Sequence, residues 1–94
     1  MNILPALRLP HIAALVQDGR VVVEVVDYEL RDMVEDHLAE ECDLEYEYLM
    51  PAIEGGPACR MVFPPGVLLS EVIDALNLLD AAEVERVFRL NNPH

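Results

Sequence analysis

The spacing of apolar residues changes along the chain, and each spacing predicts a different element. Residues 21–26 form a short β-branched run that is apolar on both faces except at Glu24, which predicts an interior strand. Apolar residues then recur at intervals of three and four, which predicts an amphipathic helix with Asp27 as its N-terminal cap. The stripe of this helix that we expect to be buried consists of Leu30, Met33, Val34, His37, Leu38 and Cys42.

The segment before the interior strand has two interpretations. Asp18 and Gly19 separate the apolar residues 12–16 from the next run, which is typical of a β-hairpin. Pro10 near a first turn and Gly19 after a last one suit a short helix equally well. The sequence therefore leaves residues 11–16 open between strand and helix.

Strict alternation of polar and apolar residues marks the segment after the amphipathic helix. Residues 43–48 alternate throughout, which predicts a half-buried strand that ends before Pro51. Three acids occupy its outer face, and its expected inner residues are Leu44, Tyr46 and Tyr48. Glycines and a proline then predict a loop at residues 54–57, followed by a second strand at residues 58–63.

The last third of the chain predicts one clear helix and one ambiguous segment. The helix starts near Val67, with Ser70 as its candidate cap. Residues 82–90 alternate well enough for a closing strand, but they also suit a helix capped by Asp80, with Glu85 paired to Arg89. Both alternatives stay open.

From Arg20 onward, the predicted order is strand, helix, strand, strand, helix and then a closing strand. This order predicts an α+β fold of the ferredoxin-like (split βαβ) type, an antiparallel sheet with two helices on one face. An extra N-terminal strand or a short helix precedes it. We expect one domain over residues 1–94, with an N-terminal arm at residues 1–19 and an α+β core at residues 20–91. Because this fold carries many unrelated functions, it predicts no activity.

Composition predicts that the chain folds and that it is located in the cytoplasm. Of its 94 residues, 53% are hydrophobic, so disorder is not expected despite a net charge of -12. No apolar run is long enough to span a membrane, and the first 19 residues lack the features of a signal peptide. Cys42 and Cys59 have no disulfide-like spacing. We therefore expect a cytoplasmic protein with reduced, structural thiols.

Missing residue types exclude several kinds of chemistry. All six bases are arginine, the chain has no lysine, and Ser70 is the only serine, which excludes lysine Schiff bases and most hydroxyl nucleophiles. A strongly acidic chain also repels nucleic acid and anionic membranes, so direct binding to either is not expected. We predict that the protein is not an enzyme and carries no cofactor.

A metal site is the one candidate left open. His37 and Glu41 stand four residues apart on the helix, with Cys42 next to them, and such a pair can bind a metal ion from one helix face. The same residues suit the buried stripe and its edge, and no further ligands stand at a recognisable spacing. The sequence does not decide whether these three residues bind a metal.

Most of the acid is concentrated in one third of the chain. Residues 24–54 hold twelve acids and one base, a local net charge of -11, and the other 63 residues sum to -1. Because these acids fall on a predicted helix and a predicted strand, they form an ordered surface rather than a tail. The carboxylates expected to contact a partner are Glu29, Asp32, Glu35, Asp36, Glu40, Asp43, Glu45 and Glu47.

Two functions follow as hypotheses. The first is a small acidic inhibitor that docks this surface on a basic, nucleic-acid-handling protein such as a nuclease, and so acts as a nucleic-acid mimic. Immunity proteins, antitoxins and phage-encoded antagonists of defence nucleases share this general character. The alternative is a sensing or assembly module that forms a homodimer through its sheet.

Overall fold

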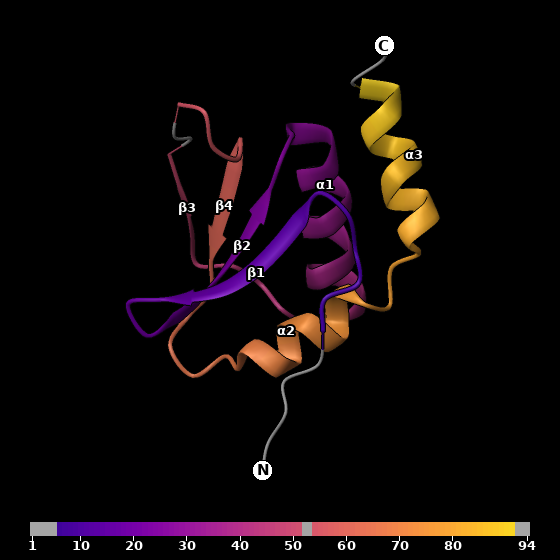
Figure 1. The fold of residues 1–94 in the computed structure, drawn as a ribbon. Coiled ribbons are helices and arrows are strands. Elements are labelled where there is room, and N and C mark those ends of the chain that lie inside the picture. The colour runs from indigo at the N-terminus through magenta and orange to yellow at the C-terminus, as the bar shows by residue number, and fades with distance from the viewer. Residues whose placement is uncertain (1–5, 52–53, 92–94) are drawn as a thin grey trace.

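The computed structural model describes residues 6–51 and 54–91, which form an antiparallel sheet with helices packed on one face (Figure 1). The strands, in chain order, are β1 (Ile12–Gln17), β2 (Arg20–Val25), β3 (Tyr48–Met50) and β4 (Cys59–Val62). The helical elements are α1 (Tyr28–Asp36), the π-helical turn η1 (His37–Glu41), α2 (Leu69–Leu76) and α3 (Ala81–Asn91). The predicted α+β class is confirmed.

The hairpin interpretation of the N-terminal segment is the one that the structure bears out. β1 pairs with β2 in antiparallel register, with Gln17 opposite Arg20. Asp18 and Gly19 have φ values of 53° and 78°, and two positive values are what a two-residue type I′ turn requires. Within the predicted N-terminal arm at residues 1–19, Ile12–Gln17 form the extra strand that was one of its two expected forms. Residues 1–5 of that arm lie outside the described residues.

The sheet has the order β1-β2-β4-β3. β4 lies between β2 and β3, the two strands that α1 connects. The closing strand of a ferredoxin-like sheet is not found at residues 82–90, which belong to α3, and β1 lies at the edge beside β2 instead. The ferredoxin-like topology is thus not confirmed, and the described chain has three helices rather than two.

Local interactions explain why the last segment is a helix. The Asp80 carboxylate accepts a hydrogen bond from the backbone N–H of Ala82 at 2.9 Å, as a helix cap does. The predicted pair is present, with Arg89 Nε 2.9 Å from Glu85 Oε1. Val84 is buried against the core. Capping, pairing and burial therefore all favour the helical alternative.

The predicted strand at residues 43–48 is wrong in its extent. Asp43 has a φ of 57°, and the N–H of Leu44 donates to the carbonyl oxygen of Leu38 at 2.7 Å, so the chain turns sharply off the end of η1. β3 begins only at Tyr48, which pairs with Val62. Leu44 and Tyr46 still pack against the core, but Tyr48 is 47% exposed on the opposite face of the sheet.

The core lies between the inner face of the sheet and the helices. In β2 the inward residues are Val21, Val23 and Val25, and β4 contributes Cys59 and Met61 beside them. As predicted, β2 is an interior strand, because β1 and β4 pair with its two edges. Burying these strands and the apolar stripe of α1 against each other is the main source of stability.

The predicted cap of α2 is also wrong. Leu68 occupies the N-cap position, and its N–H donates to the Glu71 carboxylate at 3.2 Å. Ser70 lies within the first turn. Asn77, the first residue after this helix, contacts the N-terminal segment. Its side chain accepts a hydrogen bond from the N–H of Arg8 and donates one to the carbonyl oxygen of Ala6. This pair of bonds holds the segment before β1 against the end of α2.

Candidate protein-binding surface

α1 is held in one orientation by its cap and its buried stripe. The Asp27 carboxylate accepts from the N–H of Leu30 at 2.8 Å, which confirms the predicted cap. Leu30, Val34 and Leu38 are fully buried against the sheet. Since one face of the helix is fixed inward, the acids on the other face are fixed outward, at a rise of about 1.5 Å per residue along the axis.

All but one of the predicted partner-binding carboxylates lie at the surface of the structure. Seven are exposed and Glu35 is half-buried. Three of the eight form ion pairs within the described residues: Asp32 and Glu35 with Arg31, and Glu47 with Arg20. The remaining five, which have no ion pair in the described part of the chain, are Glu29, Asp36, Glu40, Asp43 and Glu45. We call these five residues the open carboxylates.

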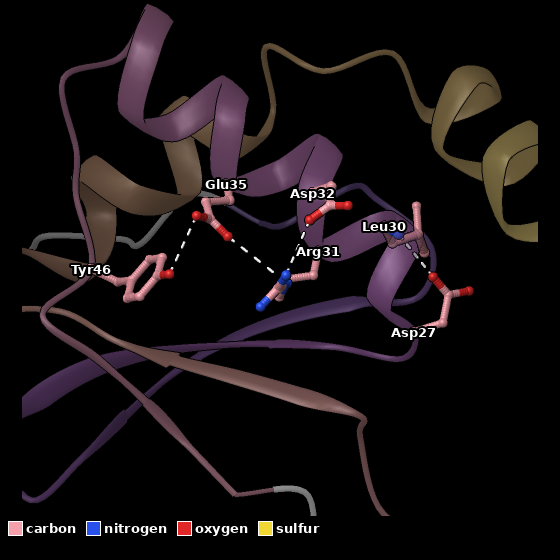
Figure 2. A network of polar contacts seen from close by, with 6 residues as sticks. All are labelled: Asp27, Leu30, Arg31, Asp32, Glu35 and Tyr46. Carbon is pink, nitrogen blue, oxygen red and sulfur yellow. Dashed lines mark hydrogen bonds and ion pairs between the residues drawn. The ribbon is translucent and has the colours of Figure 1, made fainter.

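Arg31 neutralises part of the acid on α1. Its Nη2 donates to Asp32 Oδ1 at 3.2 Å, and its Nε lies 3.8 Å from Glu35 Oε2 (Figure 2). Its guanidinium also lies 5.9 Å from the centre of the Tyr28 ring. Desolvation opposes the charge on Arg31, but the hydrogen bond with Asp32 and the charge of Glu35 outweigh it and raise the pKa of Arg31. Arg31 is thus shared by Asp32 and Glu35 and forms no ion pair with the open carboxylates.

Tyr46 connects the acidic helix, which consists of α1 and η1, to the segment that follows it. Its hydroxyl donates to Glu35 Oε1 at 3.3 Å, across the gap between α1 and residues 44–46 (Figure 2). Burial, together with the negative charge of Glu35, raises the pKa of the Tyr46 hydroxyl. This contact fixes the position of residues 43–47, which carry three of the predicted carboxylates.

The π-helical turn brings together the residues considered for a metal site. His37 is 8% exposed; its Nε2 lies 2.7 Å from the carbonyl oxygen of Ala75, and its Nδ1 lies 3.2 Å from Glu41 Oε2. Cys42 Sγ is 3.5 Å from Nε2. Both cysteines are free thiols, and burial raises the pKa of each. In residues 6–51 and 54–91, no group of three or more candidate ligands is arranged to hold a metal ion. His37 instead joins η1 to α2.

One feature of this surface was not predicted from the sequence. A cavity of about 290 Å³ opens between the acidic helix and residues 44–46, with Met61 and Phe63 of the β4 region among its lining residues. Glu35 and Glu45, two of the predicted carboxylates, also line it. Ala39 lines the cavity as well, and a larger side chain at this position would occupy part of the space.

No family model, no curated protein and no solved structure matches the chain. Within the described residues, no helix is both long enough and apolar enough to cross a membrane.

Proposed function

We propose that this protein is an acidic antagonist that binds the basic, nucleic-acid-handling surface of another protein through α1, η1 and residues 43–47. The observation that carries the proposal is the set of open carboxylates, which are exposed, form no ion pair with the described residues and lie on a helix and segment that pack against the core. The partner supplies the missing cations. Candidate partners are nucleases and other nucleic-acid-binding proteins, so the protein is an immunity protein, an antitoxin or an anti-defence protein in its general character.

Electrostatics favours such a partner in two ways. Opposite fields speed the encounter of two proteins, and this acceleration falls steeply with ionic strength. The backbone of this acidic surface also loses little freedom on binding, because helix packing and the Tyr46 contact already hold it. The same surface occupies the cationic groups with which the partner binds phosphates, and nucleic acid is thereby excluded.

Affinity capture from a lysate, followed by mass spectrometry, tests the proposal. The test variant neutralises three open carboxylates, as D36N/E40Q/E45Q. The matched control neutralises three exposed acids elsewhere, as D18N/E54Q/D74N, so that the net charge of the two variants is equal. We expect the natural protein and the control to capture the same basic protein at low salt, and the test variant to lose it. Equal capture by both variants contradicts the proposal.

A homodimer through the sheet is the second candidate. None of the described helices covers the outer face of the sheet (Figure 1). On that face Val22 and Val62 are only 1% and 2% exposed, because neighbouring side chains already cover them. Arg20 and Tyr48 line the same small hollow as Val22 and Val62, and the Arg20 guanidinium lies 5.8 Å from the centre of the Tyr48 ring. A dimer at this face predicts a doubled mass in light scattering that does not depend on salt, and a monomer at high concentration contradicts it.

A further inference from the structure

The cavity between the acidic helix and residues 44–46 has an apolar floor and an acidic wall. The core residues Leu38, Met61 and Phe63 line it, and the half-buried Ala39, Leu44 and Tyr46 supply its accessible apolar surface. Glu35 and Glu45 line it as well. Its volume of about 290 Å³ lies at the lower end of the range for ligand sites, about 300–1,000 Å³, and is large enough for one long side chain.

We infer that this cavity receives one arginine side chain of the basic partner, an inference that rests on the proposed function. An arginine has a methylene stem that covers apolar surface and a weakly hydrated, planar guanidinium that pairs with carboxylates. Those two parts correspond to the apolar floor and to the acidic wall. A lysine ammonium is more strongly hydrated and loses more on entering a partly enclosed site.

The charges around the cavity favour a cation over an apolar occupant. Glu35 already contacts Arg31 and Tyr46, whereas Glu45 is exposed and has no ion pair within the described residues. A leucine in the cavity would take water from these carboxylates without replacing its hydrogen bonds, which is costly. A guanidinium replaces those bonds with charge-assisted ones. The carboxylate of Glu45 is therefore the group that favours an arginine over an apolar side chain in the cavity.

NMR titration of the full chain with N-acetyl-arginine-N-methylamide tests the inference. We expect saturable shifts of backbone amides at residues 38–39 and 44–46, with a Kd on the order of millimolar, as such a small ligand allows. The citrulline derivative has the same shape without the charge, and we expect it to bind at least about tenfold more weakly. Equal binding by the citrulline or the leucine derivative would overturn the inference.

Variants separate the cavity from the general acidic field. Glu45→Gln removes the charge in the cavity wall, and Glu40→Gln removes an equal charge from the same surface outside the cavity. We expect the first to weaken arginine binding about tenfold and the second to change it less than about threefold. Ala39→Leu, which fills the space, should abolish the shifts. If E45Q and E40Q weaken binding equally, the cavity is not the site.

The captured partner distinguishes failure of this inference from failure of the proposed function. If D36N/E40Q weakens the partner complex but Ala39→Leu and Glu45→Gln do not, the cavity inference is overturned and the proposed function stands. If neither set of variants weakens the complex, the proposed function fails. Loss of binding in both sets, with the fold of each variant verified by its circular dichroism spectrum and melting temperature, supports both.

Discussion

Tyr46 is the residue at which the acidic surface and the core meet. Its ring packs against the core, and its hydroxyl donates a hydrogen bond to Glu35. A substitution at either residue is therefore expected to affect the other. Glu35 is held in turn by Arg31, and Arg31 by Asp32. Glu35, at the centre of this network, is half-buried, whereas the other acids of α1, Glu29, Asp32 and Asp36, are exposed.

Tyr46 should titrate above the ordinary tyrosine pKa of about 10. Because burial and Glu35 disfavour the phenolate, the folded state prefers neutral Tyr46. Its contribution to stability is fully present below the pKa of the unfolded chain and is lost as pH rises through the folded value. Ultraviolet absorbance of the phenolate in a Y28F/Y48F background measures this titration. Glu35→Gln should lower the pKa of Tyr46 while leaving it above 10, since burial remains; an unchanged titration would contradict the role of Glu35.

Removal of the α1 cap tests how firmly the helix is fixed. Asp27→Ala takes away the acceptor for the Leu30 N–H, and we expect a loss of about 1 kcal/mol in the free energy of unfolding. Asp27→Asn keeps an acceptor and serves as the control, with a smaller loss. Urea denaturation measures both. Equal losses would show that the charge, rather than the hydrogen bond, stabilises the helix start.

At the scale of elements, the β1–β2 hairpin depends on its turn. Gly19 has a φ of 78°, and a Cβ added there meets no atom within 4 Å, so any cost of Gly19→Ala comes from the backbone alone. We expect about 1 kcal/mol of destabilisation by thermal denaturation. Asp18→Asn at a φ of 53° should stay within about 0.5 kcal/mol, because asparagine tolerates this conformation. A neutral Gly19→Ala would mean that the hairpin uses another turn.

Glu85 connects α3 to the segment before β1. Glu85 Oε1 pairs with Arg89 on the same helix, and Glu85 Oε2 lies 2.6 Å from His11 Nε2, before β1. The His11 ring stacks on Phe88 with ring centres 3.6 Å apart. The hydrogen bonds from Arg89 and His11 lower the pKa of Glu85.

Because the pKa of Glu85 is lower in the folded state, the resulting stability is present above the unfolded pKa of the carboxyl. It is lost as pH falls through the folded value. We therefore expect Glu85→Gln to flatten the acid side of a plot of melting temperature against pH. Asp74→Asn, at an exposed acid on α2, is the control and should leave the slope unchanged. An unaltered slope in Glu85→Gln would show that this contact does not hold α3.

At the scale of the whole molecule, local signals predicted more than long-range ones. The Asp27 cap and the buried stripe of α1 each depend on a few neighbouring residues, and both are confirmed. The Asp-Gly turn belonged to one of two alternatives that the sequence left open, and the structure has this alternative. The strand at residues 43–48 was predicted too long because alternation does not reveal a residue such as Asp43, which turns the chain with a positive φ. Residues 82–90 had two acceptable periodicities, and the Asp80 cap favoured the helix.

The same difference between local and long-range signals applies to the candidate surface. Helical periodicity predicted which carboxylates of α1 face outward, because one apolar stripe fixes the whole helix. The cavity could not be predicted, since its lining combines residues 35–46 with Met61 and Phe63 of the β4 region, which are distant from them in sequence. Its shape depends on packing, which no single segment encodes.

The central claim is that the open carboxylates occupy the nucleic-acid-binding surface of a basic partner. Competition tests it most directly: a fluorescent oligonucleotide bound to the captured partner is titrated with this protein while its anisotropy is followed. We predict that the natural protein and D18N/E54Q/D74N displace the oligonucleotide, and that D36N/E40Q/E45Q needs about tenfold more protein to do so. An oligonucleotide that stays bound while the two proteins form a complex would contradict the claim.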